Sequence, residues 1–145
     1  MSEQPLAFRI KSLNNQIRRL LERNAIAGNE ADLTGMQYGI IGYLSEQDES
    51  ADVYQRDIEV EFNIRRSTAS GMLKLLEQTG YINRIYDTVD TRLKRVVPTE
   101  KAKELDKIAK ESVLKLQAKL TQGIPPEEME QFYKTLQKIS DNAQE

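Results

Sequence analysis

The side chains best suited to contact a polyanion cluster in the middle of this 145-residue sequence. A helix predicted over 66–78 turns small, hydroxyl-bearing and basic residues to solvent, namely Ser67, Thr68, Ser70, Gly71 and Lys74. The hairpin predicted after it adds the cations Arg84, Arg92, Lys94 and Arg95. Small and hydroxyl side chains allow close approach to phosphates and base edges, so a helix in the major groove of DNA with a basic wing beside it would use both features. Taken singly, each feature also fits a solvated helix face or an ordinary turn ion pair between Asp90 and Arg92.

The charge of the chain is divided unevenly along its length. The whole chain has 21 Lys and Arg against 23 Asp and Glu, a net charge of −2. Residues 1–64 carry a net charge of −5, residues 65–95 carry +4 and residues 96–145 carry −1. A local basic patch on a mildly acidic protein is typical of a polyanion site, and chance clustering on a solvated face is the alternative.

The sequence contains no His and no Cys, and this excludes several classes of enzyme and sensor. Neither a Ser-His-Asp nor a Cys-His relay is possible, and thiol redox chemistry and structural zinc sites are excluded as well. We therefore expect a protein that is not an enzyme and uses no cofactor or metal. The remaining enzymatic alternative depends on carboxylate or tyrosine chemistry, for which the sequence has no recognisable motif.

No segment of the sequence has the pattern of a membrane span or a secretory leader. The longest nearly apolar stretch, 40–44, is too short to cross a bilayer. Arg9 and Lys11 interrupt the N-terminal region, which lacks a secretory apolar segment. The expectation is a cytoplasmic protein with no membrane partner.

Hydrophobic periodicity and helix caps predict the elements that position the basic segment. In chain order they are helices over 5–25, 34–46, 53–61 and 66–78, a hairpin over 81–86 and 93–97, a long helix that Thr99 caps, and a last helix after Pro126. Thr34 and Gln37 have the spacing of a capping box. The fold class is mainly α with a small β hairpin, arranged as a winged helix-turn-helix.

The two terminal helical regions are amphipathic and would attach only loosely to a small central module. A second copy of the chain would bury their apolar stripes, so we expect a homodimer. The prediction is one domain over 1–145, with a winged helix-turn-helix module at 33–98 and a dimerisation region at 5–25 and 99–142.

Five motifs of the chain are similar to one protein family. They are LTGMQY at 33–38, IRRSTAS at 64–70, LEQTGYINR at 76–84, DTRLK at 90–94 and TEKA at 99–102. In these motifs the chain resembles the MarR family of winged helix-turn-helix transcriptional regulators. The resemblance covers about 30–105, and the flanking helices match the dimerisation region of the family in length and order.

The resemblance implies a DNA-binding regulator, a ligand-responsive repressor that acts as a homodimer on a pseudo-palindromic operator. Ser67, Thr68, Ser70 and Lys74 correspond to the recognition helix in the major groove, and Arg66 to a phosphate or base contact. Arg92 and Asp90 correspond to the wing, with Arg92 in the minor groove and Asp90 orienting the wing through Arg84. Lys94 of the second predicted strand is also a candidate DNA-binding residue. Gly71 and Leu75 occupy recognition-helix positions at which many relatives have longer polar side chains. This difference concerns which operator sequence is bound and not DNA binding itself.

The resemblance also implies a small effector in a cleft between the dimer helices and the DNA-binding module. Because Cys and His are absent, elimination leaves a phenolic or other amphipathic ligand. Tyr38, Tyr43 and Arg18 are the candidate ligand-binding residues, and a core role for the tyrosines with a surface role for the arginine is the alternative. Three glycines at 35, 39 and 42 share one helix face, which indicates close helix packing or a cavity kept open.

A functional alternative from another class is a winged-helix module that binds protein without DNA. Salt dependence separates the two, because a protein that neutralises several phosphates loses DNA affinity steeply as ionic strength rises.

Overall fold

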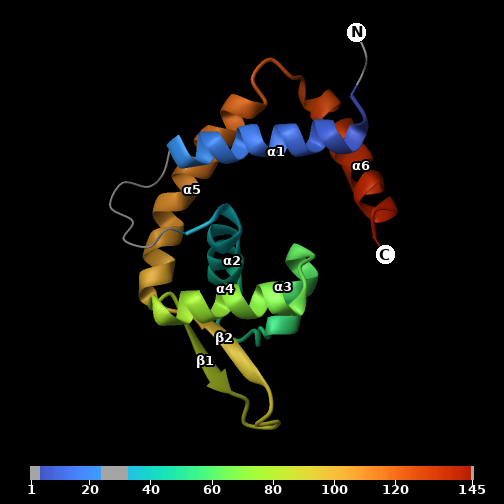
Figure 1. Ribbon diagram of the computed structural model, residues 1–145. Coiled ribbons are helices and arrows are strands. Elements are labelled where there is room, and N and C mark those ends of the chain that lie inside the picture. Colours follow the sequence, from blue (N-terminus) through green and yellow to red (C-terminus); the bar gives the residue numbers. More distant parts are fainter. Residues whose placement is uncertain (1–3, 24–32, 145) are drawn as a thin grey trace. The chain divides into compact units, whose positions relative to one another are not determined.

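The computed structural model describes residues 4–23 and 33–144 (Figure 1). Among these residues the chain forms six helices and two strands. The elements are α1 (Leu6–Arg23), α2 (Gly35–Glu46), α3 (Gln55–Phe62), α4 (Arg66–Gln78), β1 (Ile82–Tyr86), β2 (Lys94–Pro98), α5 (Glu100–Leu120) and α6 (Pro126–Asn142). The predicted winged helix-turn-helix order is confirmed, and the predicted end of the first helix at 24–25 lies outside the described residues.

The chain divides into two compact units, Met1–Ser112 and Val113–Glu145. The first unit contains the hydrophobic core, to which α2, α3, α4, both strands and the start of α5 contribute. Its fully buried large side chains are Ile40, Ile41, Ile58, Leu73, Leu76 and Ile82. The helix-turn-helix therefore rests on a core built within one chain.

Local side-chain caps explain where α2 and α5 begin. The Thr34 hydroxyl accepts the Gln37 backbone N–H at 3.3 Å, and the Gln37 side chain accepts the Thr34 N–H at 2.9 Å, so the predicted capping box is confirmed. At α5, the Thr99 hydroxyl accepts the Ala102 N–H at 3.3 Å. Both caps satisfy backbone donors that have no partner within the helix.

The predicted start of the third helix at Val53 is wrong, because this segment is extended. The Val53 carbonyl accepts a hydrogen bond from the Val96 N–H at 2.7 Å, and Tyr54 forms an isolated bridge with Arg95. The helix begins only at Gln55, where the Asp57 carboxylate accepts the Tyr54 N–H at 2.8 Å. Pairing with a distant strand overrides the local helical pattern at this point.

The hairpin follows α4 directly and projects from the helices of its unit (Figure 1). Gly80 adopts a φ of +83°, and the Tyr81 N–H donates to the Leu76 carbonyl, which ends α4 as a glycine cap predicts. The strands are antiparallel, with Ile82 opposite Pro98 and Tyr86 opposite Lys94. β1 begins one residue later than predicted, and β2 both begins and ends one residue later than predicted.

The second unit contains the end of α5 and α6. Gly123 has a φ of +78° in the connection, and Pro126 occupies the first turn of α6. No described residue of α6 is buried, and Phe132 and Leu136 are 48% and 40% exposed. Among the described residues, no helix has the length and apolar character that crossing a membrane requires.

Candidate nucleic-acid interface

The solvent face of α4 contains four of the five small or polar residues that the sequence predicts there, and it also includes the apolar side chain of Leu75. Ala69, Leu73 and Leu76 are buried on the opposite face. The exposed residues of α4 are Arg66, Ser67, Thr68, Gly71, Lys74, Leu75, Glu77 and Gln78, and Ser70 is half-buried. A Cβ built on Gly71 would meet no atom within 4 Å, so the middle of this face is open. A helix with so little side-chain bulk on its outer face allows its backbone to approach a groove closely.

Gln55 at the start of α3 connects the two helices of the helix-turn-helix, and the sequence analysis missed it. Its side-chain amide donates to the Ser70 hydroxyl at 3.0 Å and to the Arg66 carbonyl at 3.4 Å. Ser70 is half-buried as a result, and its hydroxyl proton remains available to an outside acceptor. Asn63, which has a φ of 49°, makes the turn between the helices. The sequence signal that could have identified Gln55 is its position: a polar side chain at the start of a helix can reach the backbone and side chains of the next helix.

The N-terminus of α4 carries two exposed arginines, Arg65 and Arg66. Arg65 is the N-cap residue, and its side chain makes no capping hydrogen bond. The backbone N–H groups of a first helical turn attract anions, and two cations strengthen this preference. This end of α4 therefore has the chemistry that a phosphate oxygen requires.

At the tip of the wing, Asp90 holds the Arg92 side chain through two parallel contacts. Arg92 Nε and Nη2 donate to Asp90 Oδ1 and Oδ2, each at 3.1 Å, and the Arg92 N–H donates to Oδ1 at 3.0 Å. This pairing lowers the pKa of Asp90 and raises that of Arg92. The Arg92 side chain is 88% exposed, so its other N–H donors are accessible to a ligand.

The predicted interaction of Asp90 with Arg84 is wrong. Arg84 lies on β1 with its Nε 3.7 Å from Glu77 Oε1 of α4, and only 21% of its side chain is exposed. A strand side chain that points back to the preceding helix cannot also reach the wing tip. Lys94 is exposed, and its ammonium lies 4.9 Å from the centre of the Tyr86 ring. The wing tip therefore presents Arg92 and Lys94, whereas Arg84 lies at its base.

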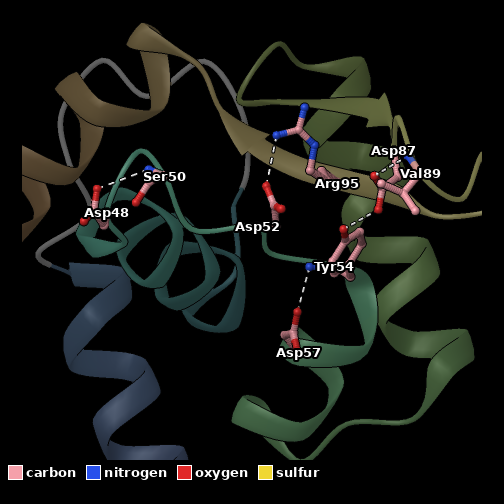
Figure 2. A network of polar contacts seen from close by, with 8 residues as sticks. All are labelled: Asp48, Ser50, Asp52, Tyr54, Asp57, Asp87, Val89 and Arg95. Atoms are coloured by element: carbon pink, nitrogen blue, oxygen red, sulfur yellow. Dashed lines mark hydrogen bonds and ion pairs between the residues drawn. The ribbon is translucent and has the colours of Figure 1, made fainter.

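Polar contacts tie the base of the wing to the start of α3 (Figure 2). The Tyr54 hydroxyl donates to Asp87 Oδ2 at 2.6 Å, and Arg95 Nη1 donates to Asp52 Oδ1 at 3.1 Å. The hydrogen bond to Asp87 raises the pKa of Tyr54 to about 12, and the same bond lowers the pKa of Asp87. The sequence analysis missed these pairs, whose members lie 33 and 43 positions apart.

The predicted ligand-binding residues do not gather into one group in the described contacts. Tyr38 and Tyr43 are half-buried against the core, and the ring of Tyr43 meets that of Phe62 edge to face at 5.9 Å. Burial raises the pKa of Tyr43. Arg18 is exposed on α1 and donates to Asn15 at 2.9 Å. These contacts favour the alternative in which the tyrosines pack and the arginine is a surface residue.

The glycine face of α2 is closely packed. A Cβ on Gly39 would lie 3.1 Å from Cε1 of Phe62, and one on Gly42 would lie 3.3 Å from Oδ1 of Asp106. These distances are shorter than most real contacts of a Cβ, so the glycines allow neighbouring side chains to approach. Among the described residues, no group of three His, Cys, Asp or Glu side chains is placed to hold a metal ion.

Comparisons with known proteins bear on the same residues. The family model described as MarR family matches residues 31–93. The uncharacterized HTH-type transcriptional regulator YybA of Bacillus subtilis is 32% identical over 76 residues, which are 52% of this chain. The match spans about half (49%) of that relative's length.

Solved structures match nearly the whole chain. The transcription regulator MarR from Oenococcus oeni PSU-1 is 29% identical with a TM-score of 0.68, and the match covers 94% of this chain and 96% of that one. MepR of S. aureus in complex with DNA is 23% identical with a TM-score of 0.83, and the match covers 97% and 99% of the two chains. The second likeness shows the fold.

Proposed function

Because this chain belongs to the MarR family of winged helix-turn-helix transcriptional regulators, we propose that it binds a double-stranded DNA operator and controls transcription there. One observation carries the proposal. The exposed Arg92 guanidinium is held by Asp90 at the tip of a wing that directly follows the small, hydroxyl-rich face of α4. The same proposal includes a cytoplasmic location and the role of a regulator rather than an enzyme.

In the proposed complex, α4 enters the major groove and the wing reaches the minor groove. Ser67, Thr68 and Ser70 contact base edges or phosphates through hydroxyls, and Lys74 adds a cation on the same face. Arg66 meets a phosphate at the start of the helix. Arg92 and Lys94 lie along the wing, where the narrow minor groove concentrates negative potential.

We propose that the active species is a homodimer with 33–98 as its DNA-binding module and 5–25 and 99–142 as its dimerisation region. Several large apolar side chains of these helices are at least a third exposed in the single chain. They are Leu6, Phe8, Ile10, Leu13, Leu21, Ile108, Val113, Leu114, Leu120, Phe132 and Leu136. A second copy would cover such stripes. Two-fold symmetry then places two recognition helices about 34 Å apart on a pseudo-palindromic operator.

We propose further that the protein is a repressor released by a small amphipathic or phenolic effector. Such a ligand weakens DNA binding only if it prefers a dimer in which the recognition helices have the wrong spacing. Adding candidate phenols to the preformed operator complex tests this step. Release of DNA at ligand concentrations that leave the dimer intact supports it, and unchanged DNA binding for all candidates contradicts it.

The proposed function is tested by fluorescence anisotropy with DNA from upstream of the gene and an unrelated duplex, over about 50 to 300 mM salt. Selective binding that weakens steeply with salt supports a regulator. Arg92→Ala should weaken operator binding by about 1 to 3 kcal/mol, and Lys74→Ala should reduce selectivity or the salt dependence. Lys107→Ala, which removes an exposed charge from α5, is the control. Weak binding with no preference for either duplex would instead indicate a distant operator or favour a protein-binding module.

A further inference from the structure

We propose that Tyr54 is a wing-positioning residue whose hydroxyl, by holding Asp87, sets the position from which Arg92 meets the minor groove. This inference rests on the proposed function, because it assigns a role in operator binding to a residue outside the expected DNA contacts. Tyr54 precedes α3, 33 positions before Asp87, the first residue of the wing loop, and belongs to neither the recognition helix nor the hairpin.

The first link is the contact between Tyr54 and Asp87. The hydroxyl donates to Asp87 Oδ2 at 2.6 Å, which is short for a hydrogen bond between oxygens and typical of an ionised acceptor. The other oxygen, Oδ1, accepts the Val89 N–H at 3.1 Å. One carboxylate therefore joins the start of α3 to the backbone of the wing loop (Figure 2).

Tyr54 itself is fixed from both sides. Its N–H donates to Asp57 Oδ2 at 2.8 Å, which places it at the N-cap of α3. The preceding residue, Val53, accepts the Val96 N–H at 2.7 Å and is buried in the core. The hydroxyl thus extends from backbone that the core and the helix hold in place, so it is a firm point of attachment for a loop.

The remaining links run from Asp87 to the wing tip. The Asp87 N–H donates to the Leu93 carbonyl at 2.8 Å, and the Leu93 N–H donates to the Asp90 carbonyl at 3.0 Å. Asp90 in turn holds the Arg92 guanidinium at two 3.1 Å contacts. A displacement of Asp87 is therefore passed through two backbone hydrogen bonds to the carboxylate that orients Arg92.

This role differs from a general contribution to folding. The strand register and the apolar core do not involve the Tyr54 hydroxyl, and Asp87 is only partly buried, so water can replace the lost donor in a phenylalanine variant. Tyr54→Phe should therefore leave the fold intact and loosen the wing loop. The consequence appears where the loop meets DNA, at Arg92.

A double-mutant cycle of Tyr54→Phe and Arg92→Ala on operator DNA tests the coupling. Tyr54→Phe alone should weaken binding by about threefold to tenfold, the net scale of one ordinary hydrogen bond, because water replaces the donor at the partly exposed carboxylate. In the Tyr54→Phe background, Arg92→Ala should cost at least about threefold less than in the parent. Val60→Ala, which shortens a 76% exposed side chain of α3 outside the proposed DNA contacts and the dimerisation region, should change neither value. Additive effects of the two substitutions would overturn the proposal.

Amide hydrogen exchange without DNA separates this inference from the proposed function. Tyr54→Phe should speed exchange at Val89 and Arg92 by about threefold or more while exchange at Ile82 and Val96 stays at the parent rate. Asp87→Ala, which also removes the Val89 contact, should have an effect at least as large. If the parent binds no operator but these rates change, the proposed function fails and the wing attachment stands. Unchanged exchange at Val89 in both variants would overturn the attachment.

Discussion

Helices α4 and α6 are both amphipathic, yet they treat their apolar stripes in opposite ways. α4 buries Ala69, Leu73 and Leu76 within its own chain, whereas α6 has no buried residue among those described. The same period of 3.6 residues therefore marks an internal core in one helix and a surface in the other. Helical periodicity therefore indicates that an apolar face needs a partner surface, but it does not show which chain supplies that surface.

The apolar stripe of α6 can be tested by placing a charge on it. Leu136→Asp places a carboxylate on the apolar stripe, and two-fold symmetry introduces it twice into the proposed interface. We expect the dimer to weaken by about 1,000-fold or more, as measured by analytical ultracentrifugation. Gln131→Asp, on a different face of α6, is the matched control. A dimer of parent affinity in Leu136→Asp would place the interface elsewhere.

A smaller effect tests the α4 side. Leu73 is fully buried, so Leu73→Ala should lower the free energy of unfolding by about 2 to 5 kcal/mol through lost burial and a residual cavity. Urea denaturation followed by circular dichroism measures this change. Because the partner surface lies within one chain, the loss should be the same at several protein concentrations. A loss that disappears at high concentration would show that α4 also depends on the second copy.

Two glycine substitutions distinguish a closely packed helix surface from an open one. Gly71 on α4 has no atom within 4 Å of a built Cβ, so Gly71→Ala should raise the free energy of unfolding by about 0.5 to 1 kcal/mol through helix propensity. Gly39→Ala gains the same propensity but forces the Phe62 ring to shift, so it should be less stable than Gly71→Ala. Thermal unfolding ranks the two variants. The reverse order would contradict close packing at Gly39.

The smallest effect concerns a polar attachment rather than an apolar one. The Tyr54 pKa of about 12 exceeds the ordinary value of 10, so its hydrogen bond stabilises the fold fully below pH 10 and is lost as pH rises through 12. An alkaline titration followed by tyrosine absorbance should contain a component near pH 12. This component should be missing from Tyr54→Phe. Its persistence in that variant would assign it to another tyrosine.

Features that depend on neighbours within one or two helical turns could be predicted from the sequence. The Thr34 capping box joins residues three positions apart, and Gly80 follows α4 directly, so both signals are local. The bounds of α4 and the exposed residues of its outer face follow from the same periodicity. The hairpin was predictable because apolar and polar residues alternate on both sides of a turn-rich segment.

Features that depend on distant partners could not be predicted. Val53 has the spacing of a helical residue, and only its pairing with Val96 makes it extended. The alternation in β1 does not say that Arg84 turns toward Glu77. Tyr54 and Asp87 carry no local signal for each other, since their contact exists only after the hairpin has docked. The sequence therefore predicted the residues at the tip of the wing, such as Arg92, but not the contacts at its base, such as that between Tyr54 and Asp87.

The pairing of residues 52–54 with β2 also has a consequence for the order of folding during synthesis. The Asp52 and Arg95 partners are 43 positions apart, and closing a loop of that length costs about 3 kcal/mol of chain entropy. The contacts among α2, α3 and α4 close shorter loops, so these helices can pack together before residues 94–98 leave the ribosome. Until residues 94–98 have been synthesised, the backbone groups of the Val53 segment have no strand partner. During that interval they can pair with the backbone of other chains, so the nascent chain is most prone to aggregation then.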